Sequence, residues 1–426
     1  MNKESIRSQR LGEEYIKVNH PSGLTLLLCP MEGFSTAYAL FATKYGSVDT
    51  TFKTQKDEEF VTVPEGIAHF LEHKLFENED CDAFALYAKT GASANAYTTF
   101  DRTAYLFACS QNFKQSLEIL LDFVQKPYFT PQSVQKEQGI IGQEIKMYED
   151  NPDQRLFFNL LQSLYVNHPV RIDIAGTVES ISHIDDQLLY RCYKTFYNLN
   201  NMVLTIAGNF KVEDVLEAAD RLLIPAEPLE IERQSPPEPD EILRGRVEQS
   251  LPVAVPLFNV GFKGAAPEDG AQSIQNLVLD ELLMEILCGE SSDLYRKLYD
   301  KGLINSTFGY EVLGGRDYMV PIFTGESRNS DEVFKELCAE IDRLRASGID
   351  TESFERCKRS NYGRYVSMFG RVEAVAGLML LCHFADVDMY TLIEIVANAT
   401  LEQLEQRLQQ DFDPRKAALS IINPVA

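Results

Sequence analysis

The sequence is short of basic residues, of long apolar runs and of any leader-like N-terminus. Lys and Arg number 40 against 64 Asp and Glu, which gives a formal net charge of −24 and an isoelectric point near 4.7. That balance argues against nucleic acid and anionic membranes as partners. The most apolar late run, residues 374–381, is too short to span a bilayer, and residues 1–10 lack the apolar core of a signal peptide. We therefore expect a soluble protein that binds neither nucleic acid nor membrane.

Clustered cysteines are also lacking. The eight cysteines are scattered along the chain without a C-x-x-C pair. This spacing argues against a disulfide framework and favours free thiols in a reducing compartment. Together with the missing signal peptide, it predicts a cytoplasmic protein. The cysteines are Cys29, Cys81, Cys109, Cys192, Cys288, Cys338, Cys357 and Cys382.

Histidine is scarce too, with six in 426 residues, yet two of them stand at metal-binding spacing. Pro64 suits the first position of a helix, and we predict a helix over 64–78. His69 and His73 then lie one turn apart on one face, where both imidazoles can reach one metal ion. Glu72 lies at the edge of that face and could take a proton from a water at the metal. The pattern is H-x-x-E-H, although helical His pairs also occur as plain surface or core residues.

A second helix carries acidic residues on a partly apolar stripe. Thr130 and Pro131 are typical of a helix start, as N-cap and first residue. The stripe that follows steps by three and four residues and mixes two carboxylates with apolar side chains: Val134, Glu137, Ile141, Glu144 and Tyr148. Carboxylates on such a face are costly unless paired or bound to a cation. An acid-rich chain also places Glu on half-exposed faces, but beside a His pair Glu144 is the leading third ligand and Glu137 its support.

The order of expected elements repeats along the chain. Residues 225–241 are rich in proline and charge, which is typical of a linker. Before them we expect a hairpin over 14–28, strands at 36–45, 103–109 and 202–208, and helices at 64–78, 82–89, 113–124, 131–148, 152–166, 182–197 and 212–223. After them we expect strands at 258–262, 307–312, 319–324 and 417–422, and helices at 277–287, 293–298, within 330–396 and at 401–412.

This repetition predicts an α+β protein made of two homologous α/β halves, each with a mainly antiparallel sheet packed against helices. The predicted domains are 1–225, which binds the metal and is catalytic, a proline-rich linker at 226–250, and a homologous domain without metal at 251–426. The chain has no histidine between His183 and His383, so the second half lacks the metal face.

With H-x-x-E-H, the pair Glu137 and Glu144, and two similar halves, the chain resembles the pitrilysin and insulin-degrading enzyme family, which includes the mitochondrial processing peptidases. Its half-length bacterial members are similar in size. The resemblance implies one Zn²⁺ per chain held by His69, His73 and Glu144, with Glu72 as general base and Glu137 supporting the site. It also implies that Asn95 and Ala96, on an edge strand, hold the backbone of a peptide substrate.

The resemblance has one departure and one consequence for assembly. Family members carry an Arg and a Tyr in the second half, where this chain has Tyr299 and Asn305. Members of this length usually work as clamshell dimers, so the resemblance implies a homodimer or a heterodimer with an inactive homologue.

Three functions follow as hypotheses. The first is a zinc metallopeptidase that cleaves peptides or small unfolded segments, since two His and a Glu with an open position form zinc's usual catalytic set. The second is a weakly active or non-catalytic peptide-binding or assembly subunit that works with a homologous partner, which the altered residues favour. The third is a metal-dependent amidase or esterase for small molecules.

Overall fold

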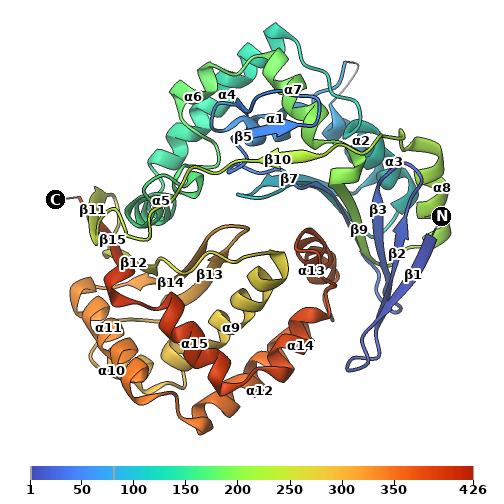
Figure 1. Cartoon of the computed structure of the whole chain (residues 1–426). Coiled ribbons are helices and arrows are strands. Elements are labelled where there is room, and N and C mark those ends of the chain that lie inside the picture. Colours follow the sequence, from blue (N-terminus) through green and yellow to red (C-terminus); the bar gives the residue numbers. More distant parts are fainter. Residues whose placement is uncertain (1, 80–81, 426) are drawn as a thin grey trace.

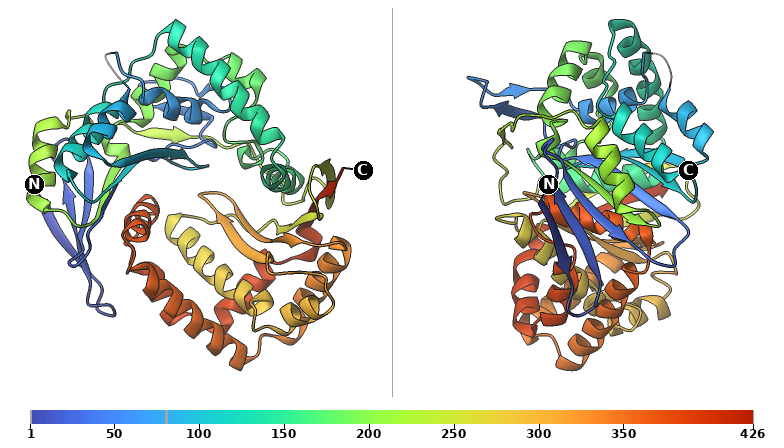
Figure 2. Two further views of the ribbon diagram at one scale, coloured as in Figure 1. Left: turned by 180° about the vertical axis from the view of Figure 1, so that it is seen from behind. Right: turned by 90° about the vertical axis from the view of Figure 1, so that its right-hand side faces the viewer.

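A computed structural model describes residues 2–79 and 82–425. The described chain forms two halves, one above the other in Figure 1, and Figure 2 shows the same division from two further sides. Each half contains one large, mainly antiparallel sheet covered by helices. The predicted α+β class with two similar halves is confirmed.

The sheet of the first half has seven strands. Their order is β1 (Asn2–Arg7), β2 (Glu14–Asn19), β3 (Thr25–Pro30), β9 (Met202–Gly208), β4 (Ala37–Thr43), β8 (Thr103–Cys109) and β7 (Ser93–Thr98). Neighbours are antiparallel except β3 and β9, which run parallel. The predicted hairpin over 14–28 is confirmed as the β2–β3 pair. Strand β7 lies at one edge of this sheet.

The sheet of the second half repeats five of these strands. Its order is β11 (Arg246–Leu251), β15 (Ala417–Pro424), β12 (Leu257–Phe262), β14 (Met319–Glu326) and β13 (Gly309–Gly314). Strands β11 and β15 run parallel and the other neighbours antiparallel. The series β11-β15-β12-β14-β13 therefore matches β3-β9-β4-β8-β7 in order and direction, as a duplicated unit requires.

The helices follow the same repeated order. Those of the first half are α1 (Ile67–Leu75), α2 (Ala83–Thr90), α3 (Phe113–Phe123), α4 (Pro131–Glu149), α5 (Pro152–Leu164), α6 (Val178–Ser182), α7 (Asp186–Phe196) and α8 (Val212–Leu222). Those of the second are α9 (Gly270–Cys288), α10 (Asp293–Asp300), α11 (Ser330–Ser347), α12 (Thr351–Met368), α13 (Val372–Phe384), α14 (Thr391–Asn398) and α15 (Leu401–Asp411). By position in this order, α1 and α4 correspond to α9 and α12.

The halves exchange one helix each. Helix α5 of the first half packs across β11, β15 and β12 of the second, and α13 of the second half packs across β3, β9 and β4 of the first. Figure 1 shows both helices beside the sheet of the other half. The apolar cores between the halves, which include Leu160 and Ile322 on one side and Val203 and Met379 on the other, are fully buried. Each half therefore completes the other's core.

The proline-rich segment joins both halves through strands. Within it, β10 (Ile231–Arg233) pairs with β5 (Thr51–Thr54), which in turn pairs with β6 (Val61–Thr62) in a small sheet. Further on, β11 belongs to the second large sheet. The segment predicted as a linker at 226–250 thus contains two short strands, one paired with each half. The domain boundaries at 225 and 251 stay a prediction.

Three predicted helix starts are wrong. The helix predicted at 277–287 begins seven residues earlier, at Gly270, because the side chain of Asp269 caps it by accepting from the Gln272 N–H. The helix predicted from Pro64 begins at Ile67, because Gly66 adopts a left-handed conformation with φ of +87° just before it. Ser182 does not cap the helix predicted at 182–197, since it is the last residue of α6. Asp185 caps α7 instead, and its side chain accepts from the Leu188 N–H.

The described cysteines are free thiols, and all but Cys338 are buried. Cys81 lies outside the described residues. Across residues 2–79 and 82–425, no single helix has the length and apolar character to cross a bilayer. Only α12 and α13 taken together reach that length and composition, and they are bent by 105° at their junction.

Candidate metal centre

Helix α1 holds the motif because one of its faces is apolar. Phe70, Leu71 and Leu75 are fully buried in the core of the first half. These three residues share one face of the helix and pack it against the sheet and α4. His69, Glu72 and His73 lie on the neighbouring face, where His69 and Glu72 remain less than a tenth exposed. The motif is therefore anchored by packing rather than carried on a loop.

The start of α1 is fixed by a close approach between two chain segments. A Cβ atom at Gly66 would lie 2.4 Å from the carbonyl oxygen of Ala175. Ser180 adds a hydrogen bond of 2.9 Å from its hydroxyl to the carbonyl of Glu65. Only glycine fits this contact and the positive φ, so the loop before α6 determines where α1 begins.

Helix α4 presents its carboxylates to α1. Thr130 and Ser133 form a reciprocal capping box, with Pro131 at the first position, which confirms the predicted helix start. Val134 and Ile141 are buried on the side that faces the core. Glu137 and Glu144, on the same stripe, reach His69 and His73 on the facing helix.

Three donor groups converge between these helices. The Oε1 atom of Glu144 lies 3.8 Å from Nε2 of His69, and Oε2 lies 3.4 Å from Nε2 of His73. One donor atom from each residue can be chosen so that all three lie within 4.8 Å of one another. Ligands bound to zinc at about 2.0–2.1 Å are roughly 3.3 Å apart at the tetrahedral angle. The three side chains therefore fit one zinc ion with little movement.

The donors are oriented by further contacts. Nδ1 of His73 lies 3.0 Å from Oε1 of Glu137, which leaves Nε2 of His73 free to face Glu144. The Tyr148 hydroxyl donates to Oε1 of Glu144 at 2.7 Å. Nδ1 of His69 is buried and has no hydrogen-bond partner among the described residues.

Burial and neighbouring charges set the protonation of the two imidazoles. Burial, followed by the charge of His73, lowers the pKa of His69 to about 4, which keeps it neutral and its lone pair available. Burial would also lower the pKa of His73, but the hydrogen bond with Glu137 and the charges of Glu144 and Glu72 raise it. Burial would raise the pKa of Glu137, but the hydrogen bond with His73 and the charge of His73 lower it. The three carboxylates thus favour positive charge beside His73.

Glu72 is placed beside the donors but is not one of them. Burial raises the pKa of Glu72, and a hydrogen bond of 2.6 Å from the Thr98 hydroxyl to Oε2 opposes that shift. Thr98 belongs to β7, so the strand edge orients this carboxylate. A carboxylate with a raised pKa, held within a cavity, is suited to accept and return a proton.

Strand β7 offers a free edge next to this carboxylate. It pairs with β8 on one side only. Asn95 is exposed, and its side-chain oxygen accepts from the Ala96 N–H at 2.9 Å. That N–H therefore points away from β8, where an extended peptide could pair with it.

Two cavities flank Glu72 and His73, and Ala96 lines both. The first, of about 320 Å³, lies toward the N-terminal end of α1 and also includes His69, Glu144 and Tyr148. The second, of about 570 Å³, lies toward the C-terminal end of α1 and is lined by apolar Phe76, Phe84 and Ile140 among others. A peptide lying along β7 would pass from one cavity to the other.

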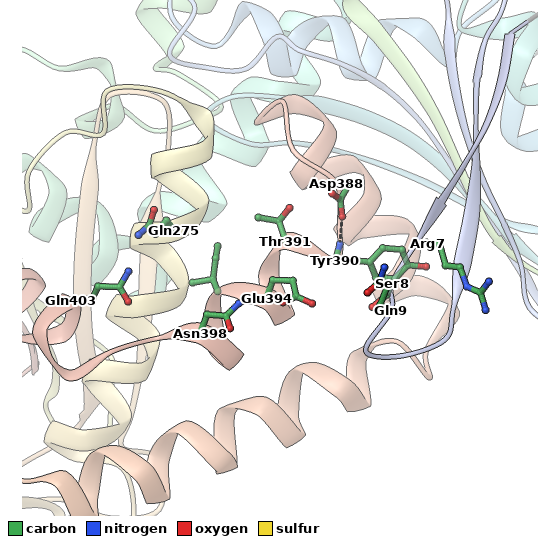
Figure 3. Close-up of a pocket in the computed structure, with 11 residues that line it drawn as sticks. Arg7, Ser8, Gln9, Gln275, Asp388, Tyr390, Thr391, Glu394, Asn398 and Gln403 are labelled. Carbon is green, nitrogen blue, oxygen red and sulfur yellow. Dashed lines mark hydrogen bonds between the residues drawn. The ribbon is translucent and has the colours of Figure 1, made fainter.

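A larger cavity, of about 680 Å³, lies elsewhere, between the end of β1 and helices α9 and α14 (Figure 3). Its lining mixes polar and apolar groups, with Arg7, Gln275, Glu394 and Gln403 among the side chains drawn. It includes no histidine or cysteine, so it offers no comparable set of zinc ligands.

The structure brings together His69, Glu72, His73, Glu137 and Glu144, with Asn95 and Ala96 at the adjacent edge. It does not bring Tyr299 or Asn305 there: Tyr299 is half-exposed on α10, which Figure 1 shows far from α1, and Asn305 donates to Glu326 at 2.7 Å. His168 is buried with Nε2 3.1 Å from Oδ1 of Asp317, and His183 is the C-cap residue that follows α6.

Sequence reasoning missed three residues of the site. Thr98 had a usable signal, because it stands two residues after Ala96 and so shares its strand face. Gln154 and Asp173 line the first cavity from α5 and from the loop before α6. Neither residue stands at a recognisable spacing from the motif.

Family models match both parts of this arrangement. The model described as insulinase (peptidase family M16) matches residues 63–178, which contain all three donors. The model described as the peptidase M16 inactive domain matches residues 183–361. A protein named uncharacterized zinc protease YmfH, from Bacillus subtilis (strain 168), is 39% identical over 413 residues, which are 96% of each chain. The chain belongs to peptidase family M16.

Solved structures agree with this M16 assignment. The crystal structure of an M16-like peptidase from Alicyclobacillus acidocaldarius is 35% identical and covers 100% of this chain and 98% of its own, with a TM-score of 0.92. Pitrilysin, at 17% identity and a TM-score of 0.74, shows the same fold over 99% of this chain. The match takes up 46% of pitrilysin, so this M16 chain is of the half-length type.

Proposed function

We propose that this M16 protein is a zinc-dependent endopeptidase for peptides or small unfolded polypeptides. The observation that carries the proposal is the convergence of His69, His73 and Glu144 beside a fourth group, Glu72, which faces the same cavity and has no ion-pair partner among residues 2–79 and 82–425. A purely structural zinc site needs no such carboxylate. The zinc-protease name of the 39% identical relative supports the same reaction class.

Each residue takes one task in this proposal. Zinc, when bound, lowers the pKa of a water molecule and polarises the carbonyl to be attacked. Glu72 accepts the proton of the attacking water and delivers it to the leaving amine, while Thr98 holds its carboxylate in place. Glu137 orients His73, and Tyr148 orients Glu144.

Substrate is held mainly through its backbone. The edge of β7 at Asn95 and Ala96 would pair with an extended peptide and align its scissile bond beside Glu72. Backbone pairing is independent of side-chain identity, so this mode predicts broad tolerance except where a cavity receives a side chain.

A second candidate is a weakly active or non-catalytic subunit that binds peptide for a homologous partner. It is favoured by the separation of α10, which carries Tyr299, from α1 and by the inactive-domain match at 183–361. Under either proposal the chain would form a homodimer or pair with an inactive homologue. The predicted dimer and the cytoplasmic location are tested together with function, by the size of the purified complex and by cell fractionation.

The test compares zinc-loaded wild type with Glu72→Gln on a complex peptide pool, with fragments read by mass spectrometry. Loss of a general base lowers the rate by about 10²–10⁴-fold, while zinc content should stay unchanged. Glu149→Gln, which alters an exposed residue of the same helix as Glu144, is the matched control and should cleave like wild type. Equal cleavage by wild type and Glu72→Gln would refute the endopeptidase. Zinc binding without any cleavage would favour the second candidate.

A further inference from the structure

The cavity at the N-terminal end of α1 contains a carboxylate that the proposed reaction does not use. Asp173 lies in the loop between α5 and α6 and lines this cavity together with Gln154, Ile174 and Ala175. His69, Glu72, His73 and Glu144 line the same space. Asp173 therefore faces whatever part of a substrate lies on this side of the metal centre.

The position of this carboxylate is set before any ligand arrives. Oδ1 of Asp173 accepts from the Ala175 N–H at 3.0 Å, and Oδ2 accepts from Nε2 of Gln154 at 3.1 Å. The backbone carbonyl of Asp173 accepts from the Gly176 N–H at 2.8 Å. Since this loop also touches Gly66 at the start of α1, Asp173 and the motif helix are fixed relative to one another. Pre-organisation of this kind lowers the cost of binding.

Charge in the cavity is unbalanced. No lysine or arginine is among the described residues that line it, and Asp173 has no ion-pair partner in the part of the chain that the structure describes. The two positive charges of a zinc ion would be offset by Glu72 and Glu144. One negative charge, that of Asp173, would remain in a partly enclosed space, where a cation is bound more strongly than in water.

Resting on the proposed peptidase function, we propose that Asp173 binds a positively charged group of the substrate and so selects substrates beside the scissile bond. The group is either a Lys or Arg side chain or the free α-ammonium of the peptide. Tyr97, Tyr148 and Ile174 line the same cavity and would contact the aliphatic stem or stack on a guanidinium. Asp173 is thus a specificity residue, distinct from the residues that hold the metal.

The test uses a cleaved peptide in which each residue near the scissile bond is replaced in turn by arginine or by citrulline, its neutral isostere. Every peptide is made with a free and with an acetylated amino end. We expect arginine to exceed citrulline in kcat/KM by about tenfold at one position, as charge-assisted hydrogen bonds do. In Asp173→Asn the ratio of kcat/KM for the arginine peptide to kcat/KM for the citrulline peptide should fall toward one. A preference that acetylation removes would identify the α-ammonium as the bound group.

The variants separate this role from a structural one. Asp173→Asn keeps an oxygen for the Ala175 N–H, so the turn persists while the charge is lost. Asp153→Asn removes an exposed charge from the first turn of α5, outside the cavity, and should keep the preference. Added salt should weaken the preference in wild type and leave Asp173→Asn unchanged.

The failures of the two proposals can be told apart. A wild type that cleaves with equal rates for arginine and citrulline at every position, free or acetylated, would overturn the role of Asp173 and leave the peptidase intact. If wild type cleaves nothing, the test measures binding instead: one fixed extended peptide is made with arginine or with citrulline at each position in turn, and each pair is titrated into zinc-loaded Glu72→Gln with and without Asp173→Asn. Tighter binding of the cationic peptide that depends on Asp173 supports the inference, and equal binding refutes it.

Discussion

In the first half, α1 and α4 direct two imidazoles and two carboxylates at one another, whereas α9 and α12, in the same places of the second half, carry Glu281, Glu285, Arg364 and Tyr365. Glu281 and Glu285 are four residues apart, the spacing of the histidines on α1. Glu281 lies 3.0 Å from Nη2 of Arg364 and accepts from the Tyr365 hydroxyl at 2.8 Å. Glu285 accepts from the Tyr310 hydroxyl of β13.

The difference shows what makes a helix pair a metal site. In the second half a guanidinium and two hydroxyls satisfy the acids, so the helix pair needs no ion. In the first half no Lys or Arg within the described residues pairs with Glu137 or Glu144, and the imidazoles leave donor atoms that face one another. The fold supplies the same helix pair twice, and in the part of the chain that the structure describes only the first copy leaves its donor atoms able to hold a cation.

The largest difference between the two halves, measured as zinc content, should come from replacing one residue of each helix pair with alanine. His73→Ala removes one of three ligands, so the chain should lose its zinc, from one ion per chain to nearly none. Glu285→Ala, the matched change on α9, should keep one zinc. Metal content after desalting measures both. If His73→Ala still held one zinc ion per chain, His73 would not be a ligand and the zinc site would lie away from α1.

Removing the charge of Glu137, which orients His73, should have a smaller effect on zinc binding. Glu137→Gln keeps a hydrogen-bond acceptor for Nδ1 of His73 but removes the charge, so zinc should bind about tenfold more weakly. Competition with a chelator of known affinity measures this change. Glu149→Gln on the same helix should bind zinc like wild type, and an unchanged affinity in Glu137→Gln would remove its assigned role.

The contact between His168 and Asp317, which joins the two halves, should make the free energy of unfolding depend on pH. Burial alone would raise the pKa of Asp317, but His168 of the first half, with Ser235 and Arg316, lowers it to about 2. A lowered pKa stabilises the folded state above the unfolded value near 4, by about 2 kcal/mol here, and this contribution is lost as pH falls through 2. Urea unfolding of wild type and Asp317→Asn should therefore differ near neutral pH and converge in acid. A constant difference would contradict the assignment.

The smallest effect should come from breaking the ion pair between Glu281 of α9 and Arg364 of α12. Arg364 is 46% exposed, and exposed pairs contribute about 0–1 kcal/mol. Arg364→Met should therefore lower the free energy of unfolding by less than about 1 kcal/mol and leave zinc content unchanged. A loss of several kcal/mol in urea unfolding would show that the second site carries more of the stability than its exposure indicates.

Local signals predicted the elements that carry the metal donors. The Thr130 cap and Pro131 define the start of α4 within the chain itself. The spacing of His69 and His73 follows from helix geometry alone. The apolar run at 202–208 predicts β9, and the pairing of this strand with β3 and β4 then holds it in the sheet.

Other features depend on contacts between distant segments. Gly66 marks the start of α1 only because Ala175 lies against it, and Asp173 reaches the cavity through a loop about 100 residues after the motif. The proline-rich segment showed no periodicity, yet β10 forms because β5 offers an edge to pair with. Tertiary contacts override local preference at these positions.

The exchange of α5 and α13 has a consequence for how sequence change spreads through the molecule. A substitution on the sheet of one half alters the surface against which a helix encoded by the other half must pack. The two copies of the duplicated unit are therefore coupled at these positions, although only the first carries the cluster of His69, His73 and Glu144. The half whose helix pair carries Glu281 and Glu285 therefore still supplies the covering on which the other half's sheet depends.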